Sequence, residues 1–156
     1  QNDIDKDKQV EFFTKQIEIA EKYNLPIIVH TRDSIQDTYN ILKKHKCTGV
    51  IHCYSGSVEM AKEFVKLGYS LGIGGVVTFK NSKLYEVVSA IDIKNILLET
   101  DSPFLSPDPF RGKKNDPSNV IYVAEKISEI KKMSVDDVIK QTTKNTINIF
   151  DLNIEI

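Results

Sequence analysis

The chain has no tryptophan, only two cysteines and no long hydrophobic run. A membrane helix needs about 20 consecutive apolar residues, and the longest apolar runs here are only a few residues. The sequence therefore predicts no membrane partner and a soluble, cytoplasmic protein. The two cysteines, Cys47 and Cys53, are not at CxxC spacing and do not indicate a metal-binding cysteine pair. The alternating pattern around Cys53 favours small buried side chains over a disulfide.

An excess of charge of one sign is also missing. The chain has 21 Lys+Arg against 22 Asp+Glu, a formal net charge of -1. A nucleic-acid partner would need a local basic patch, because the overall field does not attract a polyanion. The 156 residues are 40% hydrophobic and 28% charged, as in an ordinary globular protein. No compositional break marks a second domain, so we expect residues 1–156 to form a single domain.

The hydrophobic pattern alternates between helical and strand periodicity. Helices are expected at about 10–20, 35–44, 58–67, 84–90, 119–131 and 134–150. Four apolar runs are expected to be strands: "NLPIIVH", "GVIHCY", "YSLGIGG" and "NILLET". A Pro-rich loop from Ser102 to Pro117 follows the last of them. Apolar strands separated by single helices predict an α/β fold, with parallel strands covered by helices in a barrel or a doubly wound sheet.

Polar residues gather where these strands end. The first two strands end in His30 and His52, the third in the glycines of "GIGG", and the fourth in Glu99 and Asp101. In parallel α/β proteins the C-terminal strand ends carry the active site, and imidazole with carboxylate suits a Zn, Mn or similar ion. One histidine at a strand end is more often a structural residue. Two histidines with an acid at equivalent positions favour a metal site, in which Glu99 and Asp101 share one face.

Two basic segments lie near the predicted site. Arg32, two residues after His30, is either an exposed loop charge or a bidentate clamp for phosphate. The segment "FRGKKN" brings together Arg111, Lys113 and Lys114, and such a run is either a solvated loop or a phosphate-binding one. The glycines of "GIGG" do not have the spacing of a dinucleotide-binding motif, and they favour a close backbone approach or an open cavity floor.

Five separated segments resemble the TatD family of metal-dependent hydrolases. In chain order they are "LPIIVHTRD", "GVIHCYSG", "LGIGGVVTFK", "LLETDSPFLSPDPFRGKKNDPSNV" and "TTKNTINIF". The resemblance implies a TIM-like barrel with a divalent cofactor, Zn, Mg or Mn. It makes His30, His52 and Asp101 metal ligands and places Glu99 beside them as an acidic site residue. It also implies a phosphodiesterase, typically a deoxyribonuclease that acts on DNA ends.

Parts of the family's pattern are missing from this chain. The family has an HxH pair on its first strand and a glutamate in a "GEIGLD"-like segment, and the sequence contains neither. A complete barrel takes about 250 residues and eight strands, twice the number of strand candidates here. We therefore expect a C-terminal half-barrel that could hold one metal ion but lacks the ligands for a second.

Three functions stay open from the sequence alone. The first is hydrolysis of DNA by a metal-activated water, with Asp101 and Glu99 as catalytic residues and the basic segments binding phosphate. The second is hydrolysis of an ester or amide, for example in an aminoacyl-tRNA, because an activated water can also attack a carbonyl carbon. The third is a non-catalytic half-barrel that associates with a partner. That partner would be the missing N-terminal half or a second copy, since unpaired strand edges rarely stay bare.

Overall fold

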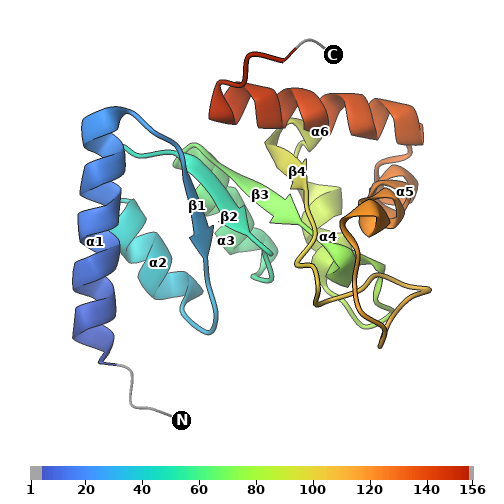
Figure 1. Ribbon diagram of the computed structural model, residues 1–156, viewed down its shortest axis with the longest axis horizontal. Coiled ribbons are helices and arrows are strands. Elements are labelled where there is room, and N and C mark those ends of the chain that lie inside the picture. The colour runs from blue at the N-terminus through green and yellow to red at the C-terminus, as the bar shows by residue number, and fades with distance from the viewer. Residues whose placement is uncertain (1–4, 155–156) are drawn as a thin grey trace.

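The computed structural model describes residues 5–154 and contains one four-stranded parallel sheet (Figure 1). Its strands are β1 (Ile27–His30), β2 (Gly49–His52), β3 (Tyr69–Ile73) and β4 (Ile96–Leu98). The order in the sheet is β1-β2-β3-β4, the same as along the chain. Each connection therefore moves one strand further in the same direction, as in a barrel, whereas the order reverses in a doubly wound sheet. The predicted α/β arrangement of four parallel strands is confirmed.

Six helices lie at the positions that the periodicity predicts. They are α1 (Lys6–Tyr23), α2 (Ile35–Leu42), α3 (Val58–Lys66), α4 (Leu84–Ala90), α5 (Val120–Lys131) and α6 (Val135–Phe150), with short 3-10 turns η1 (Gly75–Thr78), η2 (Ile93–Asn95) and η3 (Pro117–Asn119). Side-chain caps fix three helix starts: Asp5, Ser57 and Ser134 each accept a hydrogen bond from a backbone N–H of the first turn. None of the described helices combines the length and apolar character needed to cross a bilayer.

The two faces of the sheet have different surroundings. Helix α3 lies behind the strands in Figure 1, and α2, α3 and α4 all contribute residues to the main hydrophobic core. Alternate strand residues such as Val29, Ile51 and Leu71 point to that side and belong to the main hydrophobic core. The residues between them face the other side, which corresponds to the interior of a barrel. His30 and His52 are register partners and share this inner face.

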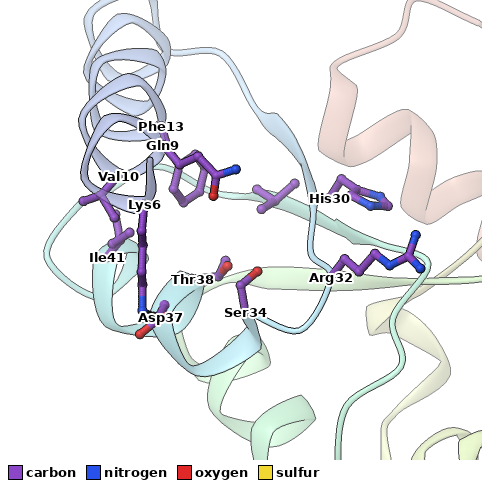
Figure 2. Close-up of a pocket in the computed structure, with 11 residues that line it drawn as sticks. Lys6, Gln9, Val10, Phe13, His30, Arg32, Ser34, Asp37, Thr38 and Ile41 are labelled. Atoms are coloured by element: carbon purple, nitrogen blue, oxygen red, sulfur yellow. Dashed lines mark ion pairs between the residues drawn. The ribbon is translucent and has the colours of Figure 1, made fainter. Parts of the chain in front are cut away.

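Strand β1 is an edge of the described sheet, and its surroundings are open. On the inner face Ile28 is 65% exposed. Beside the strand, a cavity of about 340 Å³ separates β1 from α1 and α2, and Val10, Phe13 and Ile41 give it apolar walls (Figure 2). An exposed edge of this kind is a surface on which another strand can pair.

We expect the chain to associate through the β1 edge, with a second copy or with a complementary half-barrel. Sedimentation at micromolar concentration should then detect species heavier than the 17.7 kDa monomer. Replacing Ile28 with Lys should weaken association by about tenfold or more, because burial of an isoleucine side chain is worth about 1.5–3 kcal/mol. Tyr85→Lys is the matched control, since Tyr85 is 56% exposed on α4. A purely monomeric wild-type chain would contradict this expectation.

Candidate metal centre

His52, the last residue of β2, lies between two carboxylates. Its Nδ1 is 2.8 Å from Glu99 Oε2, and its Nε2 is 3.3 Å from Asp101 Oδ1. Both acids follow the end of β4, which does not pair with β2, because β3 lies between these strands. The carboxylate of Glu99 therefore has to cross β3 to reach the imidazole.

Gly72 on β3 leaves the space through which the Glu99 side chain passes. A Cβ atom at this position would lie 2.2 Å from Glu99 Oε2, far inside van der Waals contact. Gly72 is the register partner of Leu97 in β4 and lies in the middle of the sheet. Any side chain at position 72 would displace the Glu99 carboxylate, so the site requires a glycine there.

The other oxygen of Glu99 is held by the backbone of Cys53. The N–H of Cys53 donates a hydrogen bond to Glu99 Oε1. Cys53 has a left-handed backbone with φ +46°, a conformation that is uncommon for a residue other than glycine and recurs at functional sites. Two contacts thus fix the carboxylate from the β2 side: the imidazole of His52 and the N–H of Cys53.

The Cys53 thiol belongs to this cluster, although its sequence context predicts only a small buried side chain. Ligand atoms of His52, Cys53 and Glu99 all lie within 4.8 Å of one another. Both cysteines of the chain are free, and Cys53 is half-buried. Burial and the neighbouring charge of Glu99 raise the pKa of the thiol, so its surroundings favour the protonated form as long as no metal ion is bound. Only its place directly after His52 could have drawn attention to it in the sequence.

The carboxylates also control the charge of His52. Burial lowers the pKa of the imidazole, but the hydrogen bonds and charges of Glu99 and Asp101 outweigh burial and raise the pKa above its ordinary value. The surroundings of the ring thus favour positive charge. A divalent cation would satisfy the same two acids.

The donor atoms fit a divalent ion. Zinc lies about 2.1 Å from nitrogen and oxygen ligands, so two ligands at a tetrahedral angle are about 3.4 Å apart. The 3.3 Å between His52 Nε2 and Asp101 Oδ1 agrees with that spacing. Histidines that bind metal commonly donate their other ring N–H to a carboxylate, which is the position of Glu99 at Nδ1. This geometry makes His52 and Asp101 candidate ligands and Glu99 the residue that orients the ring.

His30 lies close enough to contribute to the same centre. It pairs in register with His52, and the two ring centroids are 5.8 Å apart with the planes tilted by 41°. A ligating imidazole has its centroid about 3 Å from the ion, so two rings on one ion lie about 5–6 Å apart. The structure therefore places His30 and Asp101 each beside His52, whereas the donor atoms in residues 5–154 that all lie within 4.8 Å of one another are those of His52, Cys53 and Glu99.

A cavity of about 520 Å³ opens beside this centre. Its polar wall contains His30, Arg32 and Asp101. Arg32 also lines the smaller cavity beside β1, and Figure 2 shows that its side chain and that of His30 both point away from α1. The arginine that the sequence proposed as a phosphate clamp is thus next to the predicted metal ligands.

The second basic segment lies elsewhere. Arg111, Lys113 and Lys114 are exposed, and none of them lines the cavity beside the metal centre. The guanidinium of Arg111 stacks 4.4 Å above the ring of Phe79. Phosphate binding by these three residues stays a prediction, and it would concern a part of the substrate outside the cavity.

Comparison with known proteins identifies the family. Residues 1–151 match the family described as TatD related DNase. The chain belongs to the TatD family. It is 47% identical over 152 residues to YabD of Bacillus subtilis, an uncharacterized metal-dependent hydrolase, with 95% of this chain and 60% of that protein covered. It is 38% identical over 150 residues to YcfH of Escherichia coli K12, which is described in the same words, with 94% and 57% covered.

A solved structure agrees with this assignment. The TatD homologue YjjV of Escherichia coli K12 superimposes with a TM-score of 0.88 at 31% sequence identity, covering 94% of this chain and 57% of that one. The TatD resemblance and the barrel-type fold that the sequence predicted are confirmed. The chain spans about 60% of the length of the curated relatives it matches.

The role of Gly72 can be tested by metal binding. Gly72→Ala should weaken zinc binding by about 10–100-fold, the usual cost of disturbing a residue that orients a metal ligand. Gly74→Ala is the matched control, because a Cβ there would meet its nearest neighbour, the Glu99 carbonyl, at an ordinary 3.5 Å. Zinc affinity is measured by competition with a chelator of known affinity. Equal affinities of the two variants would show that Glu99 does not need the space above Gly72.

Proposed function

We propose that this chain forms part of a metal-dependent phosphodiesterase that hydrolyses DNA. The observation that carries the proposal is the placement of His52 between two carboxylates at the C-terminal ends of the strands. The names of the relatives, metal-dependent hydrolases, support the hydrolytic class. The family's description as related to a DNase supports the choice of DNA.

Each residue of the site has its own proposed role in hydrolysis. A divalent ion held by His30, His52 and Asp101 would supply a Lewis acid that lowers the pKa of water and neutralises phosphate charge. Glu99 would accept a hydrogen bond from the Nδ1–H of His52 and leave Nε2 available to hold an ion. Asp101 has a second carboxylate oxygen that can accept a proton from the attacking water. Arg32, at the wall of the same cavity, can bind two non-bridging phosphate oxygens.

Arg32 favours a phosphate over a carboxylic ester as the reacting group. A guanidinium offers parallel N–H donors that match two oxygens of one phosphate, whereas the carbonyl of an ester presents a single oxygen. Hydrolysis of an aminoacyl ester is the competing function, and assays on the two substrates distinguish the two.

Activity is tested on two substrates in parallel, single-stranded DNA with a free end and an aminoacyl ester. His52→Ala should lower the rate on DNA by at least about 100-fold, because removing a ligand costs more than disturbing a residue that only orients one. His45→Ala is the matched control: His45 is bonded to Glu21, 3.2 Å away, outside the metal centre. Turnover of the ester without turnover of DNA would replace the proposed function by the competing one.

Metal content tests the ligands independently of turnover. The double variant His30→Ala with His52→Ala should lose stoichiometric metal in elemental analysis, because two of three ligands are removed. Unchanged metal content would contradict the ligand assignment. A wild-type chain that binds metal but turns over neither substrate should gain activity when the remaining part of the barrel is added in trans, and failure to do so would contradict the proposed hydrolysis.

The exposed basic segment is tested through the salt dependence of DNA binding. Replacing Arg111, Lys113 and Lys114 with Gln should lower the slope of log affinity against log salt by up to about 0.9 for each phosphate that the protein no longer neutralises. Fluorescence anisotropy with a labelled oligonucleotide measures the slope. An unaltered slope would assign these side chains to the solvated surface.

A further inference from the structure

Phe104 is an exposed aromatic residue beside the metal centre. It follows Asp101 by three positions, in the loop after β4, and its side chain is 69% exposed. It lines the same cavity as His30, Arg32 and Asp101. Most aromatic rings in the described part of the chain are more enclosed, and an exposed ring at the mouth of a polar site has an apolar face available for a ligand.

The backbone around Phe104 is held firmly although the ring is exposed. Its N–H donates to the carbonyl of Asp101 at 2.7 Å, and its own carbonyl accepts from Asn115 Nδ2 at 2.8 Å. Asn115 is only 5% exposed, and its backbone N–H donates to the carbonyl of Pro103. The neighbouring Leu105 carbonyl packs so closely on Gly75 that a Cβ there would be 2.3 Å away. These contacts fix the backbone of Phe104 relative to Asp101.

The cavity is lined by apolar as well as polar residues. Apolar lining comes from Val76, Leu84, Phe104 and Leu105. Its volume of about 520 Å³ lies within the range of small-molecule sites. A ligand that matches both kinds of lining residue combines a flat apolar group with an anionic group, and a nucleotide has this combination. Bases of any sequence stack on aromatic side chains, because each base has a π-face.

We propose that Phe104 is a base-stacking residue, so that the cavity holds one nucleotide with its base on Phe104 and its phosphate between Arg32 and the metal centre. The inference rests on the proposed phosphodiesterase function and adds recognition of the base to it. It predicts that the cavity distinguishes a nucleotide from the same sugar phosphate without a base.

The test compares thymidine 5′-monophosphate with 2-deoxyribose 5-phosphate, in which a hydroxyl group replaces the base. Binding to the zinc-loaded chain is measured by isothermal titration calorimetry. The wild-type chain should bind the nucleotide about tenfold more tightly, in keeping with the usual worth of one base stacked on an aromatic ring. Phe104→Ala should remove this preference and leave the affinity for the sugar phosphate unchanged, whereas Phe104→Tyr should retain the preference.

A matched control and a folding control accompany these variants. Phe12→Ala removes a similarly exposed phenylalanine, 59% exposed on α1, and should leave both affinities unchanged. The thermal unfolding temperature of Phe104→Ala should equal that of the wild type, because the side chain is largely in solvent. A Phe104→Ala chain that binds both ligands more weakly by the same factor would assign the residue a structural role and overturn the inference.

The two proposals fail in different ways. Equal affinity of the wild-type chain for both ligands would overturn base stacking and leave the phosphodiesterase intact, because the phosphate would still bind. Binding of neither ligand by a chain that holds zinc would overturn both. A nucleotide preference that survives in Phe104→Ala would place the base elsewhere in the cavity and overturn the role of Phe104.

Discussion

The candidate metal centre depends on the contact between Glu99 and His52, which is possible because residue 72 is a glycine. Glu99 follows β4 and His52 ends β2, so the Glu99 side chain has to cross β3. It can do so because Gly72 on β3 has no side chain. With that contact in place, Nδ1 of His52 is occupied and Nε2 is directed at Asp101. The arrangement of the donor atoms on the inner face of the sheet therefore depends on the lack of a Cβ atom at Gly72.

The fold and the general place of the site could be predicted from the sequence, because both follow from local patterns. Amphipathic periodicity indicates the helices, and apolar runs between them indicate the strands. Parallel strands all end at one edge, so residues that close successive runs must meet there. His30, His52 and Asp101 are such residues; the register of β1 with β2 places His30 beside His52, and Asp101 lies 3.3 Å from His52.

Features that depend on tertiary contacts could not be predicted. The close approach expected at "GIGG" exists, but only the structure shows that Gly72 faces a side chain while Gly75 faces a backbone carbonyl. The left-handed backbone of Cys53 has no signature in the residue type. Arg111 resembles a phosphate ligand in the sequence, whereas its stacking on Phe79 involves a segment distant along the chain.

The candidate ligands His52 and Asp101 are 49 positions apart along the chain, so the donor set exists only when the strands are assembled. An ion that binds this set binds the folded state and not the unfolded one. By thermodynamic linkage it then adds to the free energy of unfolding, by about 2.7 kcal/mol at a free concentration 100 times the dissociation constant. Such an ion would also act as a cross-link between β2 and the segment after β4, two parts of the sheet that do not pair with each other.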